Sequence, residues 1–171
     1  MKNDFVKPVL ILALICLLVS GALAATNSVT QPLIESAAAE RVETAKREAI
    51  PGAEGFELIL DGAFPSSVKE AYKTTNNVGY IFMVTTTGFG GDIDIMCGIG
   101  IDGKLISSIT LQHAETKGLG SKIADEPYAS QYVGADRGLD GIAAITGATI
   151  SSNAYMTAIR DAFEAFEQIG K

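Results

Sequence analysis

The stretch with the clearest chemical potential is 146–152, with the sequence TGATISS. It joins a short apolar segment, 142–145, to an amphipathic helix predicted over 153–169. Its small residues let the backbone approach a ligand, and the hydroxyls of Ser151 and Ser152 can cap the helix. Free N–H groups at a helix N-terminus favour an anion, above all a phosphate. The same string also suits an ordinary strand-to-helix turn, so the residues alone leave both interpretations open.

A second glycine-rich segment, 113–123 (HAETKGLGSKI), follows a β-hairpin predicted over roughly 92–112. Isoleucine or cysteine occupies every second position from 93 to 101, which is typical of a strand with one buried face. The hairpin turn is signalled by an Asp-Gly pair. In the glycine-rich segment, His113 either lies near a ligand or ends a strand in solvent. Glu115 and Thr116 either bind a ligand or hold the loop.

Several further elements must position these two segments. Strands are predicted over 56–60 and 80–87, and the polar stretch 65–77 between them allows a helical turn at 68–72. A helix is predicted over 32–50, where good helix formers precede a Pro-Gly stop. Together these patterns predict an α+β fold with an antiparallel sheet flanked by helices.

The N-terminal region predicts a membrane segment. The run 9–25 (VLILALICLLVSGALAA) has no charge and reaches roughly 25 Å as a helix, close to a bilayer core of about 30 Å. Its Ala-rich end also resembles a signal-peptidase site. We expect a retained anchor. Because Lys2 and Lys7 precede the run, the positive-inside rule predicts a cytoplasmic N-terminus and an extracytoplasmic C-terminal domain.

Composition excludes several classes of protein. A formal net charge of -7 argues against a nucleic-acid partner, and two cysteines cannot form a dense disulfide scaffold. A single histidine excludes a multi-histidine metal site, and Asp92 and Asp94 are expected to be solvated. We therefore predict no metal site. The sequence contains no recognisable pair of a nucleophile and a general base. We therefore also predict no catalytic residue and no substrate turnover by this chain alone.

The two glycine-rich segments resemble motifs of one family. TGATISS resembles the flavinylation motif of the FMN-binding domain family, in which a flavin transferase links FMN through its phosphate to a Thr side chain. The matching acceptor here is Thr149. HAETKGLG at 113–120 is similar to the HxETPGLG loop of that family. The order of anchor, hairpin, loop, motif and terminal helix is similar to that of G subunits of Rnf-type complexes and C subunits of sodium-translocating NADH:quinone oxidoreductases.

The residue patterns and this resemblance together predict a cytoplasmic tip and transmembrane anchor over 1–25, a linker over 26–31 and an exported FMN-binding domain over 32–171. The resemblance implies a membrane flavoprotein subunit that relays electrons between ferredoxin and NAD, coupled to Na⁺ or H⁺ transport. Other membrane subunits and a flavin transferase would be its partners. The residues implied in binding covalent FMN are Thr149, the acceptor, with Thr146, Gly147, Ala148, Ser151, Glu115, Thr116, Gly118 and Leu119.

The sequence departs from the family pattern at two positions. The family usually has an Asp six residues before the acceptor, where this chain has Ala143, and the nearest acid is Asp140. Lys117 stands where the family usually has Pro. The first departure bears on recognition by the transferase. For this reason a structural subunit without flavin remains an alternative to the electron-relay subunit. A second alternative is a free-standing extracellular electron-transfer flavoprotein.

Overall fold

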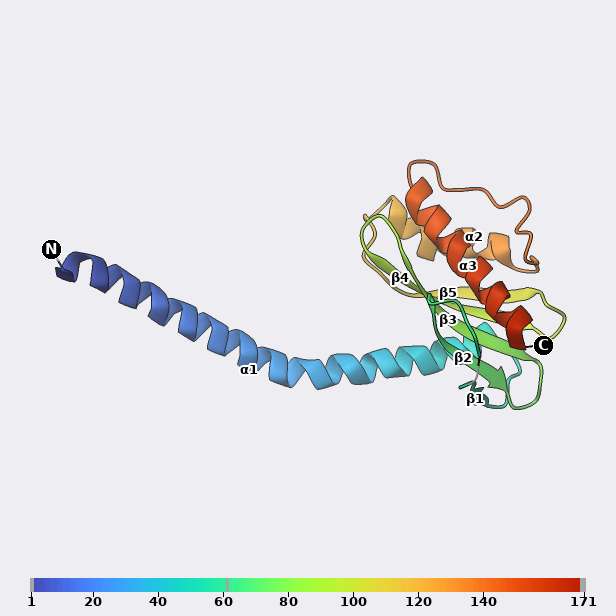
Figure 1. The fold of residues 1–171 in the computed structure, drawn as a ribbon, viewed down its shortest axis with the longest axis horizontal. Coiled ribbons are helices and arrows are strands. Elements are labelled where there is room, and N and C mark those ends of the chain that lie inside the picture. The colour runs from blue at the N-terminus through green and yellow to red at the C-terminus, as the bar shows by residue number, and fades with distance from the viewer. Residues whose placement is uncertain (1, 61, 170–171) are drawn as a thin grey trace. The chain divides into compact units, whose positions relative to one another are not determined.

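The computed structural model of the chain describes residues 2–60 and 62–169, which divide into two compact units, Met1–Arg41 and Val42–Lys171. Helix α1 (Lys2–Ala49) forms the first unit and supplies its last turns to the second. The second unit is α+β, with an antiparallel sheet flanked by helices (Figure 1).

Helix α1 contains a segment long and apolar enough to cross a membrane. The segment lies near the N-terminus, and its large apolar side chains are exposed: Val9, Leu10, Ile11, Leu12, Leu14, Ile15, Leu17 and Leu18. Exposure of this kind is typical of a surface that contacts lipid or a partner rather than a protein core.

Residues 26–31, predicted as a linker, are helical and belong to α1. Their hydroxyl groups bond within the helix: Thr26 Oγ1 donates to the Ala22 carbonyl at 2.9 Å, and Ser28 Oγ donates to the Ala25 carbonyl at 2.8 Å. Such bonds satisfy polar side chains without interrupting the backbone ladder. The division into anchor, linker and exported domain remains a prediction.

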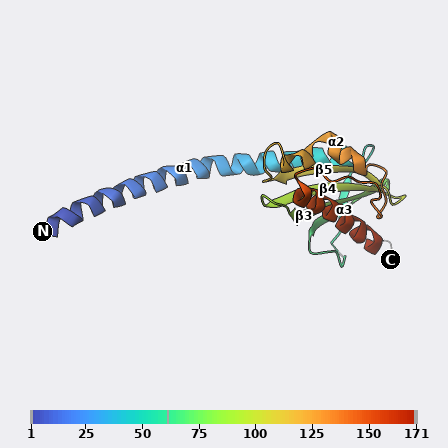
Figure 2. The same ribbon diagram turned by 90° about the horizontal axis from the view of Figure 1, so that it is seen from above.

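The sheet of the second unit is a five-stranded antiparallel meander in which every strand pairs with the next along the chain. Figure 2 shows the helical layers on its two faces. The strands are β1 (Phe56–Leu58), β2 (Val68–Thr74), β3 (Gly79–Thr87), β4 (Asp92–Gly100) and β5 (Leu105–His113).

The predicted hairpin is confirmed as β4 and β5, and the strand predicted over 80–87 is confirmed as β3. The helical turn predicted at 68–72 is wrong, because this stretch forms β2. A register shift between Val68 and Glu70 interrupts the pairing of β2 with β3. A bulge of this kind breaks the period of two by which a strand is recognised in a sequence. Residues 142–145, predicted as a short strand, lie outside the sheet.

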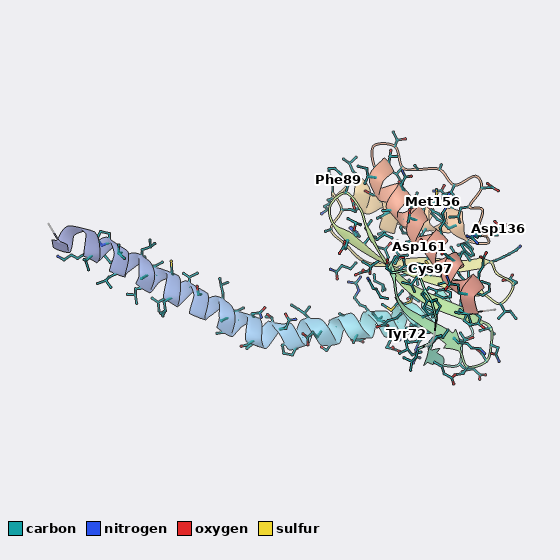
Figure 3. All side chains as sticks on the ribbon, viewed as in Figure 1. Tyr72, Phe89, Cys97, Asp136, Met156 and Asp161 are labelled. Atoms are coloured by element: carbon teal, nitrogen blue, oxygen red, sulfur yellow. The ribbon has the colours of Figure 1, made fainter. Side chains whose placement is uncertain are left out.

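One face of the sheet is covered by helix α3 (Thr149–Ile169). Ile93, Ile95, Cys97 and Ile99 of β4 are buried on this face, and Figure 3 shows Cys97 beneath α3. The segment 120–132 completes this layer with two 3₁₀ turns, η1 (Gly120–Ala124) and η2 (Ser130–Tyr132), around the short helix α2 (Glu126–Ala129).

The opposite face of the sheet is covered by the end of α1. Ala45, Ala49 and Ile50 pack there against Met96 of β4. The backbones come so close that a Cβ on Gly98 would lie 2.4 Å from the Ala49 carbonyl oxygen. Strand β4 is therefore buried on both faces, and the predicted single buried face is corrected. The cover on both sides makes β4 a rigid base for the turn that precedes it.

Candidate functional site

A cavity of about 400 Å³ lies where three segments of the second unit meet. They are the turn between β3 and β4, the loop after β5 and the first turn of α3. Figure 3 shows Phe89 on this turn, at the same end of the unit as the beginning of α3. The lining residues are Phe89, Glu115, Thr116, Leu119, Gly120, Gly147, Ala148, Thr149, Ile150 and Ser151.

Most residues predicted to bind a cofactor line this one cavity: Glu115, Thr116, Leu119, Gly147, Ala148, Thr149 and Ser151. Thr146 and Gly118 belong to the same loops but are not among the lining residues. Phe89, Gly120 and Ile150 line it without having been predicted as site residues. A signal for Phe89 was present, since a large apolar residue in a glycine-rich turn is unusual.

Helix α3 begins at Thr149, four residues earlier than predicted. Gly147 has a φ of +83°, a conformation that favours glycine, and the first helical bond runs from the Ser152 N–H to the Ala148 carbonyl at 2.9 Å. Ser151 and Ser152 thus lie inside the helix, and the prediction that they cap it is wrong. Ser152 Oγ instead accepts a hydrogen bond from the Ile145 N–H at 3.0 Å.

The beginning of α3 presents groups suited to an anion. Among the described residues, the N–H groups of Thr149, Ile150 and Ser151 have no acceptor. Unpaired N–H groups and the helix dipole together favour a phosphate at such an end. Thr149 is exposed, and its hydroxyl has no hydrogen-bond partner among the residues that the structure describes, so the hydroxyl can react or bind a ligand.

Glu115 lines the cavity and also holds the loop in place. It is 8% exposed and accepts hydrogen bonds from Phe89 and Gly90 on the preceding turn and from Ser151 on α3. His113 also acts within the loop, because its Nδ1 accepts the Glu115 N–H at 3.2 Å. The Thr116 carbonyl accepts the N–H groups of Leu119 and Ser121, both at 3.1 Å, which closes the loop into a compact turn.

Three large apolar side chains line the cavity together with Thr149. Phe89 is 69% exposed, Leu119 49% and Ile150 57%, and each comes from a different segment of the cavity wall. An apolar wall beside a helix N-terminus suits a ligand with a flat aromatic part and a phosphate. FMN has both parts, and the cavity volume lies within the roughly 300–1,000 Å³ of ordinary ligand pockets. The residues present therefore fit FMN.

Residues 88–164 match the FMN-binding domain family, and this stretch contains every residue that lines the cavity. The chain is 30% identical to the G subunit of the ion-translocating oxidoreductase complex of Methanosarcina acetivorans, over 95% of each chain. It is 28% identical to the G subunit of the Na⁺-translocating ferredoxin:NAD⁺ oxidoreductase complex of Acetobacterium woodii, over 95% of this chain and 91% of the relative. The proton-translocating counterpart of Clostridium ljungdahlii is 29% identical over 55% of this chain and 56% of its own.

Fold, cavity and sequence similarity define an FMN-binding domain that follows an N-terminal apolar helix. The chain belongs to the family of G subunits of ion-translocating oxidoreductase complexes.

Proposed function

We propose that this chain is a membrane-anchored flavoprotein subunit that relays electrons in an Rnf-type ferredoxin:NAD oxidoreductase complex. The observation that carries the proposal is the position of the exposed residue Thr149, at the N-terminus of α3 and in the lining of the cavity. All residues that line this cavity lie within the stretch that matches the FMN-binding domain family. Two relatives bear names with ferredoxin and NAD⁺ as substrates, one of them Na⁺-translocating and the other proton-translocating. Transport of Na⁺ or of H⁺ is accordingly part of the proposal.

The chain's own residues would bind and orient FMN. The hydroxyl of Thr149 would carry the phosphate as an ester, and the N–H groups of the first turn of α3 would bind its remaining oxygens. The exposed faces of Phe89, Leu119 and Ile150 would pack against the flat ring and exclude water from it. Bound FMN supplies electron transfer, which no protein side chain of this site provides.

The partners follow from this role. An electron relay needs a donor and an acceptor, which would be cofactors of neighbouring membrane subunits. A flavin transferase must reach the Thr149 hydroxyl, and the exposure of Thr149 permits this. With the domain outside the cytoplasm, covalent attachment prevents loss of FMN by diffusion. The apolar segment of α1 would hold the domain at the membrane beside these partners.

Two measurements on the native chain test this function. Gentle detergent extraction followed by purification should recover the chain with other membrane subunits, and the mass of its denatured form should exceed the sequence mass by one FMN ester. A chain that carries FMN but purifies alone would support the free-standing flavoprotein. A chain that purifies with the complex but carries no FMN would support the structural subunit.

Recognition by the transferase is tested at the position that departs from the family motif. Ala143 and Asp140 are both exposed in the loop before α3, and the Ala143 N–H donates to Gln131 Oε1 at 3.3 Å. We expect normal flavinylation of the wild type with relaxed dependence on an acid at position 143. Ala143→Asp should then change FMN occupancy less than about twofold, because exposed substitutions rarely alter stability by more than about 0.5 kcal/mol.

Mass spectrometry after co-expression with a flavin transferase measures this occupancy. If Asp140 substitutes for the usual acid, Asp140→Ala should lower occupancy while Ala143→Asp has little effect. A large gain in occupancy with Ala143→Asp would contradict the expectation, since it would show that the wild-type chain is a poor substrate for lack of that carboxylate.

A further inference from the structure

The carboxylate of Glu115 joins the three segments that line the cavity. Its Oε1 accepts hydrogen bonds from the backbone N–H of Phe89 at 2.8 Å and of Gly90 at 3.2 Å. Its Oε2 accepts one from the Ser151 hydroxyl at 2.7 Å. Ser151 lies in the first turn of α3, two residues after Thr149. One buried side chain thus fixes the β3–β4 turn and the beginning of α3 relative to the loop after β5.

The surroundings are fitted to this carboxylate. A Cβ on Gly88 would lie 2.0 Å from Oε1, and a Cβ on Gly120 would lie 2.4 Å from Oε2, so glycine at both positions leaves the carboxylate its space. All its partners donate, which is the pattern that an ionised carboxylate accepts. Within residues 2–60 and 62–169, no Lys or Arg forms an ion pair with Glu115. Its negative charge is therefore held by dipoles and is not neutralised by a cation.

We propose that Glu115 is a positioning residue that also fixes a negative charge at the cavity wall and so lowers the midpoint potential of bound FMN. This inference rests on the proposed function. Reduction adds electrons to the flavin, and a fixed anion at the cavity wall disfavours the added negative charge. Glu115 also acts through position, because its carboxylate accepts hydrogen bonds from Phe89 and Ser151, which both line the cavity.

Glu115→Gln separates the charge from the geometry. The glutamine amide oxygen can still accept from Phe89 and Gly90, and its NH₂ group can donate to Ser151, whose hydroxyl can accept as well as donate. In the full-length chain loaded with FMN, we expect occupancy to stay within about twofold of wild type, as for a substitution that keeps its hydrogen bonds. The midpoint potential, measured by spectroelectrochemical titration, should rise.

Asp102→Asn is the matched control for charge. Asp102 lies in the β4–β5 turn, at the opposite end of strands of nine residues, roughly 30 Å along the sheet from the β3–β4 turn at about 3.3 Å per residue. This distance exceeds the Debye length of about 8 Å at physiological salt. Removal of this charge should leave the midpoint potential unchanged.

Glu115→Ala tests the positioning role without FMN. When the chain is prepared without a flavin transferase, loss of the carboxylate leaves the Phe89 and Gly90 N–H groups without an acceptor. Hydrogen exchange at these two amides should accelerate by about tenfold, as expected for the loss of buried acceptors. Glu115→Gln should exchange at these amides as wild type does.

The outcomes separate the two proposals. Wild-type chain without FMN would defeat the proposed function, while the exchange experiment would still test the positioning role. An FMN-loaded Glu115→Gln chain with the wild-type potential would overturn the electrostatic role, as would an equal rise in Asp102→Asn. Loss of FMN from Glu115→Gln with wild-type exchange would also overturn the inference, because it would assign the carboxylate a direct contact with FMN or with the transferase.

Discussion

Thr149→Ala should abolish covalent FMN and leave the domain folded. Thr149 is exposed and lies at the N-terminus of α3 in the cavity lining, and within the described part of the chain its hydroxyl has no hydrogen-bond partner. Since alanine is a better helix former than threonine, the change should alter the free energy of unfolding by less than about 0.5 kcal/mol. The mass of the denatured chain should lose the FMN increment completely, and in-gel flavin fluorescence should disappear.

Two further variants make this expectation specific to the hydroxyl. Thr149→Ser keeps a hydroxyl at the same position and should retain part of the FMN. Thr146→Ala removes the other exposed threonine of the motif and should remain loaded. FMN that survives denaturation in Thr149→Ala would contradict the assignment and place the acceptor elsewhere in the motif.

The structure disfavours the neighbouring serines as alternative acceptors. Ser151 is 2% exposed and donates to Glu115, while Ser152 is fully buried and its hydroxyl accepts the Ile145 N–H. Either hydroxyl would have to break a buried hydrogen bond and leave the core before a transferase could reach it, which costs about 1–3 kcal/mol for the partner left unpaired. Thr149 needs no such rearrangement.

Local patterns predicted the elements that hold the cavity more reliably than the cavity itself. The β4–β5 hairpin follows from alternation and an Asp-Gly turn, which are both local signals. Strand β2 was missed because its bulge interrupts that alternation. The beginning of α3 was placed too late because the left-handed Gly147 sets it, and a positive φ is not visible in the sequence.

Two of the residues missed at the candidate site, Phe89 and Gly120, lie far from Thr149 in the sequence and join it only in the fold, whereas Ile150 was missed although it directly follows Thr149. Phe89 reaches the cavity because its N–H donates to Glu115, a residue 26 positions further along the chain. Glu115 itself was predicted with two alternatives, ligand binding or loop support. Its hydrogen bonds to the β3–β4 turn and α3 show that it supports the loop, and no local pattern encodes those contacts. Contact of Glu115 with a ligand stays a prediction.

A membrane-impermeant maleimide should label Glu164→Cys in intact cells and leave Asn3→Cys unlabelled. Glu164 is exposed on α3, in the domain that the positive-inside rule places outside the cytoplasm, whereas Asn3 precedes the apolar run with Lys2 and Lys7. The expected contrast is all or none, because the reagent does not cross the membrane. Permeabilised cells should label both variants equally.

The wild-type chain gives the background for this experiment. Cys16 lies within the apolar run of α1, away from an aqueous reagent if that run spans the membrane, and Cys97 is buried under α3. Burial raises the pKa of the Cys97 thiol to about 12, so almost no thiolate is present near neutral pH to react. Wild-type protein should therefore remain unlabelled until it is denatured.

The same samples distinguish a retained anchor from a signal peptide. With a retained anchor, the labelled Glu164→Cys chain keeps the mass of the N-terminal residues and remains in the membrane fraction. With a cleaved signal, the chain would begin near Ala25 or Thr26 and leave the membrane. Label on Asn3→Cys instead of Glu164→Cys would reverse the proposed topology and place the Thr149 site in the cytoplasm. A flavin relay there could exchange electrons directly with cytoplasmic carriers, so this experiment also decides which partners the FMN could serve.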